Sequence, residues 1–262
     1  MLGMPATTDF DVKFRLLGIP VRINPLFWVV TAMLGWGGRE RGGAEVIIWI
    51  ACVFVSILVH EFGHGLTTRA LFQNNPSIIL YGMGGLCFSN GEERDLRKRA
   101  LVIFMGPVAG FLLFGLVLGL GLLVLGFGPV LGHTIVAHTP PAWFLNLPER
   151  SILFTLYAYG DLLYINLFWG LVNLLPIYPL DGGQLAQVFL SMHDRRQGAR
   201  RSYIVGLVTA GLIAIWLFTI ESYINAFFVA YLAMLNFQLL QASHYQQQYG
   251  DTSDDDDNWW RR

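Results

Sequence analysis

Charged residues are scarce in this chain. They make up 13% of its 262 residues, whereas hydrophobic residues make up 54%, and an ordinary soluble domain carries roughly 25% charged residues. This composition argues against a water-soluble domain and predicts a protein embedded in membrane lipid. The formal net charge is −1, which gives no overall attraction to nucleic acid, so we expect no nucleic-acid partner.

Two further features are missing. The two cysteines, Cys52 and Cys87, form neither a paired framework nor a C-x-x-C motif, so the sequence does not reveal the redox compartment. The segment Met1 to Thr8 lacks the apolar stretch of a cleavable signal peptide. We therefore expect the first membrane span itself to direct targeting.

Long apolar runs, in contrast, are abundant. A bilayer core requires roughly 20 apolar residues per helix, and a search for that length gives six candidate spans: Pro25–Gly37, Val46–Leu66, Ala100–Gly126, Ser151–Pro176, Tyr203–Ile220 and Tyr223–His244. The first is short and can start as early as Ile19. Little more than Glu221 and Ser222 separates the last two, which predicts a tight helical hairpin. The expected fold class is an all-α polytopic membrane protein with about six transmembrane helices.

The basic residues predict an orientation. Of the 17 Lys and Arg residues, 14 fall on one side of the predicted spans, and only Arg39, Arg41 and Arg150 fall on the other. Because cytoplasmic loops carry an excess of Lys and Arg, we expect a multi-pass protein of the cell membrane with both termini in the cytoplasm.

His60, Glu61 and His64 lie inside the second apolar run, in the pattern H-E-x-x-H. Residues four apart share one face of a helix, so both imidazoles can reach one metal ion with Glu61 beside them. Ionisable residues are costly within a bilayer and indicate function there. The pattern predicts a zinc site within the membrane, displaced toward the cytoplasmic side.

A catalytic zinc site with two histidines needs a third protein ligand and an open position for water. Asp181 is the candidate, at the end of the run Asn173-Leu-Leu-Pro-Ile-Tyr-Pro-Leu-Asp-Gly-Gly. The prolines break the fourth span and the two glycines permit unusual backbone angles, so we expect an irregular segment to deliver Asp181. A helix-ending turn capped by Asp181 is the alternative.

These two motifs, with the order of the spans that carry them, resemble the site-2 protease family of intramembrane zinc metalloproteases. The resemblance covers most of the chain. It implies that His60, His64 and Asp181 bind one Zn²⁺ per chain, that Glu61 is the general base, and that Asn173 helps to hold the reacting peptide and to stabilise its oxyanion. The implied activity is hydrolysis of peptide bonds within or near the transmembrane segments of membrane-protein substrates, that is, regulated intramembrane proteolysis.

Two further segments are similar to family elements. Ile78 to Leu86 resembles the membrane-associated strand and glycine loop that follow the H-E-x-x-H helix, which implies substrate binding by Ile79, Leu80, Gly84 and Gly85. Met105 to Gly110 resembles the A-G-P-x-x-N signature, with Met105 in place of Ala and Gly110 in place of Asn. The composition of Ser77 to Phe88 favours a β-like edge that receives an unwound substrate, although an amphipathic connector on the membrane surface stays open.

The chain has room for neither the PDZ domain nor the CBS pair of many family members. We therefore expect one catalytic core over residues 1–250 and an acidic, disordered cytoplasmic tail over 251–262. The alternative function is a non-proteolytic membrane protein that binds or transports metal. A di-iron desaturase would need more histidine clusters than the single pair in a span. The sequence leaves the substrate and the oligomeric state open.

Overall fold

The computed structural model of this protein describes residues 6–36, 42–89, 94–125, 127–130, 133–136 and 141–249. The chain divides into two compact units, one formed by Met1–Glu93 with Met105–Leu171 and the other by Arg94–Phe104 with Val172–Arg262. The predicted single core over residues 1–250 stays a prediction. The predicted acidic tail, 251–262, lies outside the described residues.

Five of the six predicted spans are membrane-length helices. Within the described residues, the helices long and apolar enough to cross a membrane are α2 (Gly43–Phe72), α3 (Leu96–Leu120) continued by the π-helical turn η1 (Gly121–Leu125), α5 (Glu149–Asn173), α7 (Gly198–Thr219) and α8 (Tyr223–Tyr249). The chain is a multi-pass membrane protein of mainly helical fold. The expected tight hairpin is present, because three residues separate α7 from α8.

The first predicted span differs from the others. Helix α1 covers only Pro25–Trp36, 12 residues, about 18 Å at 1.5 Å per residue against a hydrocarbon core of roughly 30 Å. The residues with which the span could have started earlier, Ile19–Ile23, form strand β2. In β2 every second residue is buried, beginning with Ile19, and a period of two suits a strand rather than a helix. The first predicted span, Pro25–Gly37, is therefore a short helix, and the earlier start at Ile19 is wrong because those residues form a strand.

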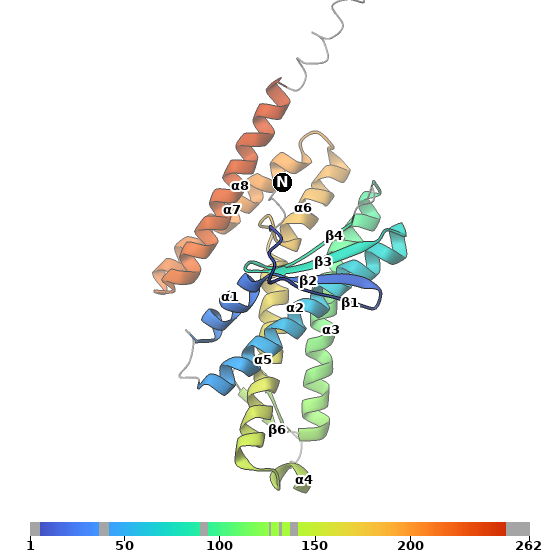
Figure 1. Cartoon of the computed structure of the whole chain (residues 1–262). Helices are drawn as coiled ribbons and strands as arrows, with labels where there is room; N and C mark the ends of the chain where they lie inside the picture. The colour runs from blue at the N-terminus through green and yellow to red at the C-terminus, as the bar shows by residue number, and fades with distance from the viewer. Residues whose placement is uncertain are drawn as a thin grey trace, which may run out of the picture. The chain divides into compact units, whose positions relative to one another are not determined.

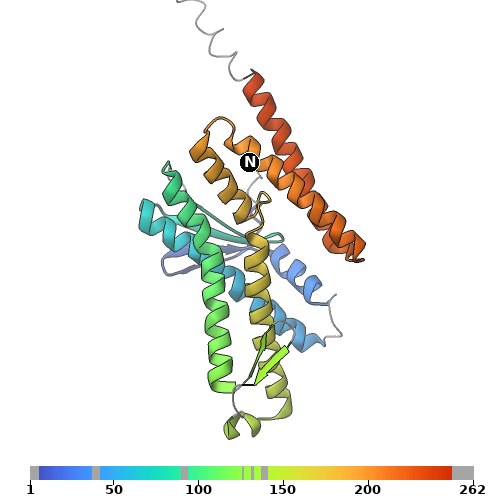
Figure 2. The same ribbon diagram turned by 180° about the vertical axis from the view of Figure 1, so that it is seen from behind.

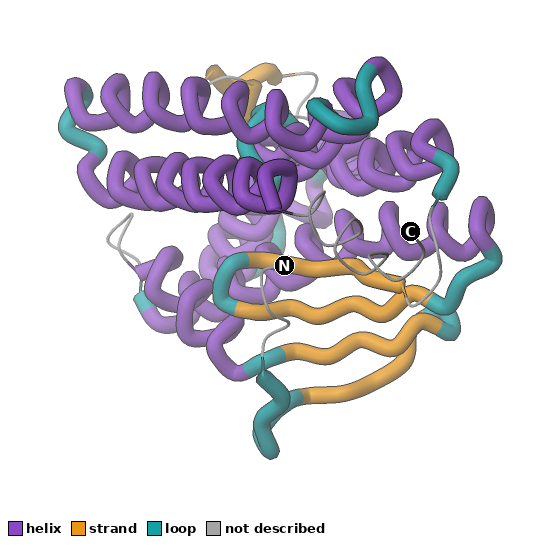
Figure 3. The backbone as a smooth tube through the Cα atoms, turned by 90° about the horizontal axis from the view of Figure 1, so that it is seen from above, coloured by secondary structure: helices purple, strands orange, loops and turns teal. Residues whose placement is uncertain are grey.

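A four-stranded sheet belongs to the first unit, and Figure 3 shows its strands side by side. The strands are β1 (Val12–Leu16), β2, β3 (Pro76–Tyr81) and β4 (Gly84–Ser89), in that order across the sheet. Strands β2 and β3 are parallel, and the other neighbours are antiparallel. The β-like segment expected after the second span is thus present, and its strand β3 pairs with β2, which precedes the first helix.

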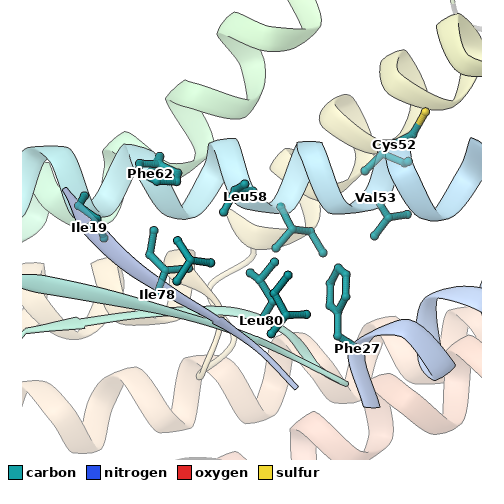
Figure 4. Close-up of a cluster of buried hydrophobic side chains, with 12 residues drawn as sticks. Ile19, Phe27, Cys52, Val53, Leu58, Phe62, Ile78 and Leu80 are labelled. Atoms are coloured by element: carbon teal, nitrogen blue, oxygen red, sulfur yellow. The ribbon is translucent and has the colours of Figure 1, made fainter. Parts of the chain in front are cut away.

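The core of the first unit lies between this sheet and α2. Ile19, Ile78 and Leu80 from the strands pack against Leu58 and Phe62 of the helix, as Figure 4 shows. On a membrane helix such packing stabilises through van der Waals contact rather than through removal of apolar surface from water. This packing holds the sheet against the part of α2 that carries the H-E-x-x-H residues.

Helix α1 packs along the other part of α2. The Trp49 indole N–H donates a hydrogen bond to the carbonyl of Thr31, 3.1 Å away, and Gly35 lies against the Trp49 ring. Strand β2 leads directly into α1. Between them, the Asn24 N–H donates a hydrogen bond to the Leu80 carbonyl of β3 at 2.8 Å. The sheet and α1 therefore cover successive stretches of α2.

The remaining elements complete the two units. In the first, α5 runs beside the later part of α3 (Figure 2), and Gly170 lies against the Phe111 ring. The short elements β5 (Phe127–Val130), β6 (His133–Val136) and α4 (Ala142–Leu145) lie between them in sequence. In the second unit, α6 (Asp181–His193) precedes the α7–α8 hairpin, whose helices run side by side in Figure 1.

Candidate metal centre

Helix α2 brings the two histidines of the H-E-x-x-H motif together. The helix is unbroken from Gly43 to Phe72, so His60 and His64 lie one turn apart on one face, as the spacing predicted. Their Nε2 atoms are 3.2 Å apart, and the ring centroids are 4.9 Å apart at an interplanar angle of 79°. Both rings therefore point their Nε2 atoms toward the same position.

This arrangement fits a metal ion. Zinc–nitrogen bonds are about 2.0 to 2.1 Å long, so two nitrogens on one tetrahedral zinc lie about 3.3 Å apart, which matches the observed separation. In the described residues, His60, Glu61 and His64 form a buried group whose potential ligand atoms all lie within 4.8 Å of one another. The group can hold one Zn²⁺.

Glycines let the backbone of α3 approach this face of α2. A Cβ atom at Gly106 would collide with the His64 imidazole and lie 2.9 Å from Nε2 of His60. A Cβ at Gly63 would collide with the carbonyl of Met105. Only hydrogen fits at these positions, so the two helices meet backbone to backbone beside the imidazoles. This assigns a packing role to Gly106, within the segment that resembles A-G-P-x-x-N.

Strand β4 lies against the glutamate. A Cβ at Gly85 would collide with the Glu61 carboxylate, so the strand backbone forms one wall beside this group. The next residue toward the turn, Gly84, has φ of +121°, a conformation that favours glycine, and the Trp169 ring of α5 lies beside it. The two glycines predicted to bind substrate are thus close to the predicted base.

The strand residues need a correction. We expected Ile79 and Leu80 to offer a strand edge, but both lie on β3, which is paired with β2 on one side and β4 on the other. Their backbone groups cannot form the open edge, and the Leu80 side chain is in the core. In the described part of the chain, the edge strand on this side of the sheet is β4, which carries Gly84 and Gly85.

In the second unit, Asp181 is the first residue of α6. This differs from the expected delivery by an irregular segment, because the irregular stretch ends at Leu180. The two glycines that follow explain the geometry: a Cβ at Gly182 would collide with the Leu174 carbonyl, and one at Gly183 with the Tyr178 nitrogen. The first turn of α6 therefore packs directly on the backbone of residues 174–178. Asp181 is buried.

Asn173 is the last residue of α5 and is also buried in the second unit. The segment after it is held by its own backbone: the Leu180 N–H donates to the Ile177 carbonyl at 2.9 Å. The Gln184 amide adds a bond to the Pro179 carbonyl at 3.0 Å. Asn173 and Asp181 are thus ends of one short, tightly bonded connection.

Two polar residues of the spans have structural partners. The Nδ2 of Asn166 in α5 donates to the Ser56 hydroxyl of α2 at 2.9 Å. Asn236 of α8, which sequence reasoning missed, is fully buried and bonds the backbone of Tyr178. The feature of the sequence that could have indicated Asn236 is an amide inside an apolar span, because polar groups are costly there.

Comparisons with known proteins identify the family of this chain. A family model described as peptidase family M50 matches residues 48–218. A Synechocystis sp. protein that carries a zinc metalloprotease name is 30% identical over 181 residues, which cover 65% of this chain and 41% of that protein. Stage IV sporulation protein FB of Bacillus subtilis is 26% identical over 237 residues, 89% of this chain and 70% of that protein.

The fold has a solved counterpart. The site-2 protease from Methanocaldococcus jannaschii is similar, with a TM-score of 0.50, 17% sequence identity, and coverage of 90% of this chain and 94% of that chain. This likeness concerns the fold. Against several curated relatives with zinc metalloprotease names, the chain spans 41 to 47% of their length.

The contact at Gly106 gives a test of the centre. Gly106→Ala places a methyl group in the space of the His64 imidazole, so we expect zinc affinity to fall about 10- to 100-fold, the usual effect of disturbing the surroundings of a ligand. Gly115→Ala on the same helix is the matched control, because a Cβ there meets nothing within 4 Å. Zinc affinity is measured by chelator competition on both purified variants. Equal affinities would contradict this site.

Proposed function

Because this chain belongs to peptidase family M50, we propose that it is an intramembrane zinc metalloendopeptidase of site-2 protease type. Its substrates would be membrane proteins, cut within or near their transmembrane segments in regulated intramembrane proteolysis. The observation that carries the proposal is the pair of Nε2 atoms of His60 and His64, 3.2 Å apart, with the Glu61 carboxylate beside them in a membrane-length helix.

The proposed metal ligands are His60, His64 and Asp181, with one Zn²⁺ per chain. Two imidazoles and one carboxylate are an established ligand set for catalytic zinc, with an open position for water. Zinc bound by such a set supplies Lewis acidity and lowers the pKa of water to about 7. The two imidazoles would hold the metal through Nε2, the atoms that lie 3.2 Å apart.

Glu61 would act as the general base and then as the general acid. Its carboxylate accepts the proton of the attacking water and donates it to the leaving amine. The Gly85 wall limits where this carboxylate can move, which keeps it beside the imidazoles. Asn173 would donate its amide N–H to the oxygen on which negative charge develops at the scissile carbonyl.

The substrate would bind as an extended strand at the edge of β4. A helical segment hides its carbonyl groups in its own hydrogen bonds, so it must unwind locally before hydrolysis. An edge strand offers unpaired backbone groups to such a stretch. Strand β4 is suited to this role because its Gly85 lies against Glu61, so an added strand would run close to the proposed base.

Glu61→Gln tests hydrolysis directly. We expect cleavage to fall by about 10²- to 10⁴-fold, the usual contribution of a general base, while zinc content stays near one equivalent per chain. The assay co-expresses the native chain or the variant with a panel of tagged single-span membrane proteins, and His60→Ala is the control that should lose zinc as well. A variant that still cleaves would rule out this role for Glu61. The transport alternative would be favoured by a different result: the native chain cleaves no substrate, and the Glu61→Gln variant still takes up metal.

The β4 edge has its own test. Alternate residues of an antiparallel edge strand direct their N–H groups outward, so one of the neighbours Leu86 and Cys87 donates toward the open side. Proline at that position removes the donor without breaking the ladder. We expect one of Leu86→Pro and Cys87→Pro to keep zinc and thermal stability but to cleave more slowly than its alanine counterpart. Cleavage equal to the alanine controls in both would exclude the β4 edge.

We also propose that both termini are in the cytoplasm of a cell that carries this protein in its cell membrane. The basic turn between α6 and α7 would then be cytoplasmic, and the turn between α7 and α8 would be outside, because α7 has 22 residues, about 33 Å of helix. In a chain with Cys52 and Cys87 replaced by alanine, we expect a membrane-impermeant reagent to label Ser222→Cys in intact cells and Arg196→Cys only after lysis. The reverse pattern would invert the orientation.

A further inference from the structure

Asn236 lies in the interior of α8, which is otherwise a largely apolar helix. Its side chain is fully buried, with 0% of its surface exposed. Burying an amide away from water costs several kcal/mol unless hydrogen bonds compensate, and polar residues within membrane spans mark function by default. The partners of Asn236 therefore indicate why an amide is needed at this position.

The amide bonds both backbone groups of a single residue. Its Nδ2 donates to the carbonyl of Tyr178 at 2.7 Å, and the N–H of Tyr178 donates to its Oδ1 at 3.3 Å. A second bond from Nδ2 to the Leu232 carbonyl, 2.8 Å long, ties the amide to its own helix. Asn236 thus forms hydrogen bonds with both the backbone N–H and the backbone carbonyl of Tyr178, as a neighbouring β-strand does.

Helix α7 leaves room for this amide at one glycine. A Cβ at Gly206 would collide with Oδ1 of Asn236 and would lie 2.9 Å from its Cγ. The same Cβ would lie 3.3 Å from the carbonyl oxygen of Pro176. The close approach of α7, the Asn236 side chain and the segment from Pro176 to Tyr178 therefore depends on glycine at position 206.

The bonded residue is three positions before Asp181. The Tyr178 nitrogen lies close to Gly183 in the first turn of α6. Tyr178 also lies inside the turn that the Leu180 N–H closes by donating to the Ile177 carbonyl. Ile177 itself is buried with Ala210 of α7 and Leu232 of α8. Displacement of Tyr178 must therefore move the first turn of α6.

We propose that Asn236 is a positioning residue for the metal ligand Asp181. It does not touch the metal or the substrate. It holds the backbone of Tyr178 so that the first residue of α6 presents its carboxylate in one place. This inference rests on the proposed function, which gives Asp181 its role as a ligand.

The experiment compares the full-length native chain with Asn236→Ala in detergent. Zinc affinity is measured by competition with a chelating dye, and we expect a loss of about 10-fold or more, as for residues that orient metal ligands. The visible absorption of the cobalt(II)-loaded protein should change as well, because it reports coordination geometry. A side chain that only stabilised α8 would lower the melting temperature and leave the cobalt spectrum as it is.

Two other positions sharpen the comparison. Asn225→Ala is the matched control, because Asn225 is an exposed asparagine on the same helix, and it should change neither affinity nor spectrum. Gly206→Ala displaces the amide from the opposite side and should reproduce the effect of Asn236→Ala. The double variant should lose no more than Asn236→Ala alone, because the group displaced by the new methyl is already absent.

Asp181→Ala separates failure of this inference from failure of the proposed function. Loss of zinc in Asp181→Ala, with native affinity and spectrum in Asn236→Ala and Gly206→Ala, would overturn the positioning role and leave the function standing. Zinc retained at native affinity in Asp181→Ala would show that Asp181 is not a metal ligand. The positioning role of Asn236 would then fail as well. Strictly additive losses in the double variant would also count against the role.

Discussion

A polar group at membrane depth has no water to bond, so the protein itself must provide its partner. This constraint governs where the polar residues of the chain lie. The amide of Asn166 bonds a hydroxyl on another helix, and the amide of Asn236 bonds a backbone segment between helices. The sheet meets the same demand by pairing its strands. On α2, the Nε2 atoms of His60 and His64 lie 3.2 Å apart, and with Glu61 these side chains form a buried group that can hold a metal ion.

Local features of the site were predictable from the sequence because α-helical geometry is local. A spacing of four residues places His60 and His64 on one face whatever surrounds the helix, and the observed separation of their Nε2 atoms agrees. The long helices followed from apolar run length for the same reason. The resemblance to site-2 proteases was carried by these motifs, and family membership confirms it. The third ligand and the residues that contact substrate stay proposals.

Non-local features were not predictable. The segment around Ile79 has the composition of a strand, but nothing in it specifies that β2, which precedes α1, occupies one of its edges. The same lack of local signal concealed the start of α6 at Asp181, where a break at prolines is followed at once by a helix. The pairing of Asn236 with Tyr178, 58 residues away, needs the fold before it can be recognised. In each case the deciding contact joins distant parts of the sequence.

The parallel pairing of β2 with β3 has a consequence for biosynthesis. Val21 pairs with Ile78, and α1 and α2 are both made between them. At roughly 5 to 20 residues per second, β2 leaves the ribosome about 3 to 11 s before its partner. Strand β4, which lies against Glu61, follows α2 along the chain and therefore emerges after the helix that carries His60, Glu61 and His64. The site matures only when β3 and β4 have emerged and joined a hairpin that was made first.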